Sequence, residues 1–162
     1  MQVPGRYSET GSTLYTGGAT LAQRMKEDEY ESFLLGHART ATLATVRADG
    51  SPHAAPVWFD LDGDTFVFTT GEATVKGRNI RRDPRLSLCI DEEEPLFHFV
   101  VREGTAELTA EDPDLLHWAT RIGGRYRGAE RAAEYGRRNA VAGELLVRVT
   151  PRKILAYKNI SD

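Results

Sequence analysis

A strand-like segment passes into a short basic helix in the stretch TTGEATVKGRNIRRDPR, residues 69–85. Residues 69–71 end an apolar run, Thr74 is a residue type that caps helix N-termini, and Pro84 marks the end of the helix. Backbone N–H groups converge at such a helix start, and the helix dipole favours negative charge there. This stretch therefore predicts a binding site for a phosphate or carboxylate group.

The same stretch holds positive charge that the rest of the chain lacks. Residues 74–85 contain one acidic residue, Asp83, and five basic residues: Lys76, Arg78, Arg81, Arg82 and Arg85. Their local net charge is +4, whereas the whole chain carries −3, so the remaining residues carry −7. A small anionic ligand is one interpretation of this cluster, and a solvated basic helix face is the other.

Length and composition indicate the class of protein. The 162 residues are 40% hydrophobic and 28% charged, which is typical of a soluble globular chain. No apolar run approaches the ~18 residues that span a bilayer. The start of the chain lacks the pattern of a secretory leader, and the single Cys89 cannot form an internal disulfide, so we expect a cytoplasmic protein without a membrane span. The net charge of −3 argues against nonspecific binding to duplex nucleic acid.

One domain is expected behind an N-terminal arm. Residues 1–20 are rich in Gly, Ser and Thr without helical or strand periodicity, which indicates a flexible arm. Residues 21–162 are expected to form a single domain. It begins with an amphipathic helix over residues 21–38, in which apolar residues recur at helical spacing until Gly36.

Strand patterns dominate the chain after this helix. Alternation and turn signals predict strands over residues 40–47, 52–61, 65–70, 86–91 and 97–102, and a last strand run over 144–157. In the strand over 97–102, Phe97, Phe99 and Val101 are expected to share the apolar face, opposite Arg102. Because Pro56 cannot donate to a ladder, the strand over 52–61 is expected to be bulged or to lie at an edge.

Two more helices are predicted between these strands. Asp112 and Pro113 are a good helix start, and the apolar stripe that follows runs to Gly123 and Gly124, while a weaker helix is expected over residues 129–139. Strands and helices do not alternate along the chain, so the order of elements does not indicate a parallel sheet. The sequence therefore predicts a mainly β fold with peripheral helices, an antiparallel barrel of about six strands.

Few residues form a pattern typical of catalysis or metal binding. The four histidines have no paired spacing and predict no metal site: His37, His53, His98 and His117. Cys89 alternates with core residues and is assigned no chemistry. Residues 123–128, GGRYRG, lack the Lys-Ser/Thr ending of a P-loop. They are expected to form a flexible basic loop, with Arg125, Tyr126 and Arg127 as candidates to line a pocket mouth. No catalytic residue is assigned.

A second candidate surface is the small-residue strand from Ser51 to Trp58. It offers backbone amides and a flat apolar wall to a planar ring. Those residues are equally compatible with an ordinary packed edge strand.

Three segments give the chain a family resemblance. Residues 43–53, LATVRADGSPH, resemble the first hairpin of the split β-barrel superfamily related to pyridoxamine 5'-phosphate oxidase. Residues 75–88, VKGRNIRRDPRLSL, resemble its cofactor-phosphate segment, and residues 104–108, GTAEL, resemble the strand that follows. The deazaflavin-dependent members of the actinobacterial branch are similar in particular. The resemblance spans about residues 38–157 and implies a six-stranded antiparallel split β-barrel, in a homodimer with two cofactor sites at the subunit interface.

The resemblance also implies roles for individual residues. Lys76 and Asn79, with Thr69, Thr70 and Arg78, are expected to hold the phosphate end of the cofactor. Backbone groups of one strand are expected to line the ring: His53, Ala54, Ala55, Pro56, Val57 and Trp58. Some relatives carry an Arg at the position of Thr74, so a contact to the cofactor's acidic tail is either lost here or supplied by Arg125 or Arg127.

These features predict an oxidoreductase that uses the deazaflavin coenzyme F420. It is expected to transfer a hydride between the ring and an unsaturated small-molecule substrate, with Tyr126 and His53 as candidate proton sources. One alternative is an FMN-dependent oxidoreductase of the same fold. Another is a noncatalytic protein that binds a flavin, haem or tetrapyrrole, with His53 or His98 as a haem ligand. The last is a dimeric interaction domain that binds no cofactor.

Overall fold

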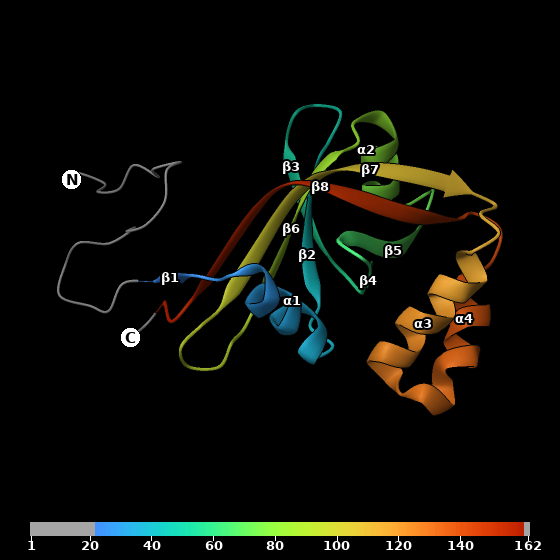
Figure 1. Cartoon of the computed structure of the whole chain (residues 1–162). Coiled ribbons are helices and arrows are strands. Elements are labelled where there is room, and N and C mark those ends of the chain that lie inside the picture. The colour runs from blue at the N-terminus through green and yellow to red at the C-terminus, as the bar shows by residue number, and fades with distance from the viewer. Residues whose placement is uncertain (1–21, 161–162) are drawn as a thin grey trace.

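A computed structural model describes residues 22–160, which form eight strands and four α-helices (Figure 1). The strands are β1 (Gln23–Arg24), β2 (Ala41–Val46), β3 (Pro52–Val57), β4 (Asp60–Asp62), β5 (Thr65–Gly71), β6 (Arg85–Asp91), β7 (Phe99–Ala110) and β8 (Glu144–Lys158). The helices are α1 (Glu27–Gly36), α2 (Val75–Arg82), α3 (Leu115–Arg127) and α4 (Ala132–Asn139). The arm predicted over residues 1–20 lies outside the described residues.

The strands form one antiparallel sheet in the order β3-β2-β6-β7-β8-β5-β4, and β1 pairs with β8. β7 and β8 pair from Phe99↔Tyr157 to Ala110↔Leu145 and form the long twisted ribbon of Figure 1. The mainly β fold with antiparallel neighbours is therefore confirmed. Eight strands stand in place of the six predicted, because the chain adds the short β1 and divides the strand predicted over 52–61 into β3 and β4.

The helix predicted over residues 21–38 is shorter than expected. α1 begins only at Glu27, because Gln23 and Arg24 pair with Lys158 and Tyr157 at the far end of the chain. Its first turn is closed by the Glu29 carboxylate, which accepts a 2.8 Å hydrogen bond from the backbone N–H of Lys26. A short strand of two residues has no periodicity of its own, so local sequence gave no sign of it.

β3 has a single strand neighbour in the described sheet and therefore lies at its edge, as the proline at position 56 predicted. The strand ends at Val57, and pairing resumes in β4 with Asp60 opposite Val67 of β5. The prediction of one continuous strand over 52–61 is wrong. The chain turns here because β3 pairs with β2 whereas β4 pairs with β5, at the other end of the sheet order.

The core lies against the inner face of the sheet and includes Phe59, Phe66, Phe68, Leu88 and Ile90. In β7 the expected faces are reversed: Val100 and Arg102 are buried, whereas Val101 is half-buried and Phe97, before the strand, is exposed. The guanidinium of Arg102 is accommodated because it packs 5.1 Å from the Phe66 ring centroid and donates a hydrogen bond to the Asp64 carbonyl. A charged residue thus occupies a core position that the alternation assigned to the outer face.

Helices α3 and α4 form an antiparallel pair at the end of the sheet where β7 ends and β8 begins (Figure 1). α3 continues through Gly123 and Gly124 to Arg127, so the loop predicted over 123–128 is wrong. The glycines serve close packing: a Cβ on Gly123 would lie 2.6 Å from Cβ of Tyr135. The helix also begins later than predicted, at Leu115.

Among the helices between residues 22 and 160, none has the length and apolar character that crossing a membrane requires.

Candidate functional site

The predicted anion site is a tight corner between the end of β5 and the start of α2. Thr74 caps α2, because its Oγ1 accepts a 3.0 Å hydrogen bond from the N–H of Gly77. The same hydroxyl donates to the Gly71 carbonyl at 2.8 Å and lies 3.1 Å from Oγ1 of Thr70. The predicted N-cap is confirmed, and the buried Thr70 hydroxyl belongs to this corner. Thr69, one residue earlier, is half-buried and pairs with Leu146 of β8.

Gly77 lets the helix start this close to the strand. A Cβ at this position would lie 2.5 Å from the backbone oxygen of Gly71 and 3.2 Å from that of Glu72. Backbone atoms cannot move aside cheaply, so a side chain at position 77 would push α2 away from β5. The N–H groups at the start of α2 therefore lie beside the β5 terminus because residue 77 is glycine.

The basic cluster, which comprises the cations of α2 and Arg85 of β6, is mostly hydrogen-bonded within the chain. Four of its five cations have partners: Arg78 donates to the Ala73 carbonyl, Arg82 donates to the Val46 carbonyl, Arg81 pairs with Glu72, and Arg85 pairs with Asp83. Lys76 is the fifth, and its half-buried side chain forms no hydrogen bond or ion pair with any residue from 22 to 160. Among residues 22–160, Lys76 is therefore the one cation of this cluster with all its donors open to an anionic ligand, whereas Arg78 and Arg82 keep their charge but each uses a donor on a carbonyl.

The charge of Lys76 interacts with Glu144, the first residue of β8. Glu144 pairs with Gly71 in the β5–β8 ladder, so its side chain reaches the same corner. Burial raises the pKa of Glu144, and the positive charge of Lys76 acts in the opposite direction. Sequence reasoning missed Glu144, because it lies far from the basic stretch in the chain and only the strand pairing brings it there.

Asn79 joins α2 to the β2–β3 hairpin. Its Nδ2 donates a 3.0 Å hydrogen bond to Oγ1 of Thr45, and that hydroxyl lies 3.4 Å from Nδ1 of His53. Asn79 and Thr45 are both buried, with 4% and 3% of their surfaces exposed. The structure thus brings two predicted site residues, Asn79 and His53, onto one short polar chain, in which the Asn79 amide positions the hairpin.

The outer face of the β2–β3 hairpin is flat and carries small side chains. Ala44 pairs with Ala54, and Thr42 pairs with Pro56, and all four are exposed. On the opposite face Leu43 and Val57 are buried in the core, with Ala55 and His53 half-buried. β3 therefore presents an open apolar surface, of the kind predicted to lie against a planar ring, beside an edge without a further strand in the described sheet.

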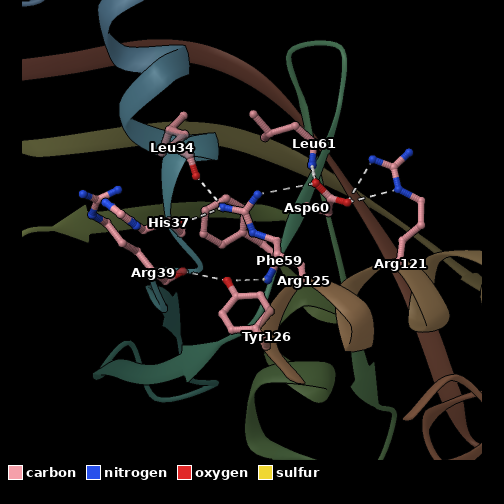
Figure 2. Close-up of polar contacts among 9 residues, drawn as sticks. All are labelled: Leu34, His37, Arg39, Phe59, Asp60, Leu61, Arg121, Arg125 and Tyr126. Atoms are coloured by element: carbon pink, nitrogen blue, oxygen red, sulfur yellow. Dashed lines mark hydrogen bonds and ion pairs between the residues drawn. The ribbon is translucent and has the colours of Figure 1, made fainter. Parts of the chain in front are cut away.

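Arg125, which was predicted to line a pocket mouth, instead makes contacts inside the protein (Figure 2). Its guanidinium donates hydrogen bonds to the carbonyls of Leu34 and His37, lies 3.9 Å from the buried Asp60 carboxylate and packs over the Phe59 ring. Only 13% of its side chain is exposed. Arg125 therefore fastens α3 to the α1–β2 connection and is not open to a cofactor tail. Arg127 is exposed and packs 5.5 Å from the Tyr135 ring centroid.

Tyr126 has a similar structural role. Its hydroxyl donates a 2.6 Å hydrogen bond to the Arg39 carbonyl and accepts one of 3.2 Å from the N–H of Phe59 (Figure 2). Burial raises the pKa of this phenol. The ring stacks on Trp58, with centroids 4.7 Å apart and planes 4° from parallel. The hydroxyl proton is thus held by a backbone carbonyl, which does not suit the predicted proton source.

His98 and Cys89 have structural surroundings that do not indicate reactive chemistry. Nδ1 of His98 accepts a 3.2 Å hydrogen bond from the N–H of Asn159, and its ring meets Phe33 edge-on. Burial, followed by the charge of Asp91, raises the pKa of the Cys89 thiol, which disfavours the thiolate. Within residues 22–160 no group of three His, Cys, Asp or Glu side chains is arranged to hold a metal ion.

Two cavities lie away from β3. One, of about 700 Å³, runs along the α3–α4 pair between Leu116, His117 and Ala132. The other, of about 390 Å³, borders the corner described above and is lined by Glu72, Glu111 and Glu144 together with apolar residues of the α4–β8 connection. The second cavity therefore adjoins the Lys76 corner, on the side where carboxylates gather.

Comparison with known proteins matches most of the chain to one family. The family described as pyridoxamine 5'-phosphate oxidase matches residues 27–158. A curated pyridoxine/pyridoxamine 5'-phosphate oxidase of Cupriavidus necator is 35% identical over 114 residues, which cover 66% of this chain and 50% of that protein. The chain thus spans about half the length of the curated relatives that it matches.

Solved structures share the architecture. A conserved hypothetical protein of Mycobacterium tuberculosis, Rv2991, superposes with a TM-score of 0.72 at 28% identity, over 83% of this chain and 86% of that one. A structure described as an F420 reductase superposes with a TM-score of 0.55 at 23% identity, over 76% of this chain and 94% of that one. The second likeness concerns the fold alone.

Proposed function

Because the chain belongs to the pyridoxamine 5'-phosphate oxidase family, whose members include oxidoreductases, we propose that it is an oxidoreductase that uses coenzyme F420. It transfers a hydride between the deazaflavin ring and an unsaturated small-molecule substrate. The coenzyme, when bound, supplies the hydride chemistry, and the protein binds and orients the ring and excludes water from it.

The observation that carries this proposal is the state of Lys76. It is the cation of the α2 cluster without a partner among residues 22–160, and it lies in the first turn of a helix capped by Thr74. A lysine beside a helix N-terminus combines a point charge with converging N–H groups, which suits a phosphate. Lys76 therefore holds the coenzyme's phosphate, with Thr69 and Arg78 at the rim of the site, whereas Thr70 and Asn79 fix the corner and the hairpin around it.

The flat outer face of β2 and β3 supports the placement of the ring. Ala54 and Pro56 are exposed there, and their small side chains let a planar ring approach the backbone of residues 53–58. Trp58 closes one end of this strand, where it stacks on Tyr126. The same open face and the β3 edge support a homodimer in which the partner subunit completes each site.

The proton that completes the reduction comes from solvent or from His53. The Tyr126 hydroxyl is not proposed for this role, because it donates to the Arg39 carbonyl. His53 is half-buried on β3, and its Nε2 forms no hydrogen bond with the residues that the structure describes. Its side chain lies on the face of β3 opposite Ala54 and Pro56, so His53 is the donor only if the substrate reaches that face, and otherwise solvent supplies the proton.

An FMN-dependent oxidoreductase is the second candidate. The curated relatives carry the name of pyridoxine/pyridoxamine 5'-phosphate oxidase, which favours a flavin. In that case Lys76 would hold the ribityl phosphate at the same corner. The two candidates therefore share a site and differ in the ring and in the charge of the phosphate.

A binding experiment separates them. The purified protein is stripped of bound small molecules after a visible spectrum is recorded, and is titrated with F420 and with FMN while ligand fluorescence is followed. We expect F420 to bind more tightly than FMN. Tighter binding of FMN would favour the second candidate, and binding of neither would remove both.

A further inference from the structure

Glu144 is fixed at the corner that holds Lys76. Its backbone N–H donates a 3.0 Å hydrogen bond to the Val141 carbonyl, and the neighbouring Gly143 carbonyl accepts a 2.8 Å bond from the N–H of Glu72. Gly71 lies opposite it in the ladder, and a Cβ on Gly71 would lie 3.2 Å from Oε1 of Glu144. The backbone of Glu144 is therefore fixed, and its carboxylate lies against the end of β5.

The Glu144 carboxylate lacks a hydrogen-bond donor in the described part of the chain. Within residues 22–160 its oxygens accept no hydrogen bond and form no ion pair, although the side chain is only half exposed. The charge of Lys76 favours its ionised form, whereas burial disfavours it. The other charges at this corner are the Glu72 carboxylate, bonded to Arg81, and Glu111 across the adjoining cavity. An anion that reaches Lys76 therefore also meets the field of Glu144.

We infer that Glu144 limits the charge of the phosphate that Lys76 accepts, so that the site prefers a singly charged phosphodiester to a doubly charged phosphate monoester. The inference rests on the proposed function and adds the basis for choosing between its two candidates. FMN ends in a monoester, which carries a charge of about −1.5 to −2 at neutral pH. The phosphate of F420 is a diester and carries one negative charge. Repulsion from the Glu144 carboxylate falls with distance, so it acts chiefly on the phosphate at Lys76, where FMN carries more charge than F420, and less on the acidic tail of F420 beyond it.

The test is the effect of Glu144→Gln on the dissociation constants of riboflavin, FMN and F420, measured by fluorescence at neutral pH and low salt. Removal of the carboxylate is expected to strengthen binding by about threefold for each unit of phosphate charge, which means roughly five- to tenfold for FMN and about threefold for F420. Riboflavin lacks a phosphate and should bind the two proteins equally. High salt should shrink the gain for FMN.

Glu134→Gln is the matched control. It makes the same change in net charge, but Glu134 lies on α4 and is already paired with Arg131. It should leave the ratio of the FMN and F420 constants unchanged. An equal ratio in wild-type and Glu144→Gln proteins, with F420 binding still dependent on Lys76, would overturn this inference and leave the proposed function standing. Binding of neither coenzyme by the wild-type protein would overturn both.

Discussion

The side-chain amide of Asn79 donates a 3.0 Å hydrogen bond to Oγ1 of Thr45, and this bond joins helix α2 to strand β2. Both residues are buried, so neither group can turn to water when the other is lost. Helix α2 and the β2–β3 hairpin are thus held together by a buried side-chain hydrogen bond, beside the exposed bond from Arg82 to the Val46 carbonyl.

Asn79→Ala is expected to lower the free energy of unfolding by about 1–3 kcal/mol, because it leaves the buried Thr45 hydroxyl without its donor. Urea unfolding measures the loss. The double variant Thr45→Val/Asn79→Ala removes both partners and should be less destabilised than the sum of the two single variants. Strict additivity, or an unchanged midpoint for Asn79→Ala, would show that the bond does not hold the two elements together.

Tyr126→Phe tests whether the Tyr126 hydroxyl on α3 contributes to stability or to proton transfer. The variant keeps the stack on Trp58 but leaves the Phe59 N–H and the Arg39 carbonyl without the hydroxyl, which should cost about 1–3 kcal/mol of stability. Hydride transfer from reduced F420 to an unsaturated acceptor, followed by the absorbance of the coenzyme at a temperature where the variant is folded, should keep its rate. A large loss of rate without a loss of stability would identify Tyr126 as the proton donor after all.

Much of the fold could be predicted from local patterns, because strand alternation and turn signals are read directly from neighbouring residues. The basic helix and its Thr74 cap were predicted for the same reason, since both depend on residues 69–85 alone. β1 was missed because two residues acquire their conformation from Lys158 and Tyr157. The α3 boundary was wrong because Gly123 serves contact with Tyr135 and not helix termination.

The candidate site also has features that local sequence predicts and features that only tertiary contacts determine. The sequence indicates which side chains are basic but not which of them already have partners, and here four of the five cations between Lys76 and Arg85 have partners in the described chain. Glu144 reaches the corner only through the β5–β8 pairing, and Arg125 is drawn away from it by the carbonyls of Leu34 and His37. Tertiary contacts therefore decide which predicted residues remain open to a ligand.

Gly77→Ala tests the close approach of α2 to β5. The added methyl would lie 2.5 Å from the Gly71 backbone oxygen, so the helix start must shift, at a cost of about 1–3 kcal/mol in stability. Gly36→Ala is the matched control, because a Cβ there has no neighbour within 4 Å. Thermal melts should show a lower midpoint for Gly77→Ala alone. Equal midpoints for the two variants would contradict the crowded corner.

The ion pair between Asp112 and Arg148 predicts a loss of stability in acid. The 2.7 Å hydrogen bond from Arg148 holds the pKa of Asp112 below its ordinary value. A carboxyl whose pKa is lowered by folding stabilises the protein above its unfolded pKa of about 4, and this contribution is lost as the pH falls through the folded pKa. Asp112→Asn should therefore be less stable at neutral pH and show a shallower decline in stability below about pH 4. Urea unfolding at a series of pH values measures the slope, and an equal slope in both proteins would refute the assignment.

The most direct test of the proposed site is the dissociation constant of F420 for Lys76→Ala, measured by fluorescence titration beside the wild-type protein. Loss of a charge-assisted hydrogen bond should weaken binding by about 1.5–3 kcal/mol, which is about 10- to 150-fold. Arg81→Ala removes a cation of the same helix that is already paired with Glu72, and should change the constant by less than about threefold. A constant for Lys76→Ala equal to that of the wild-type protein, with the fold intact by circular dichroism, would contradict the assignment of Lys76 to the coenzyme's phosphate.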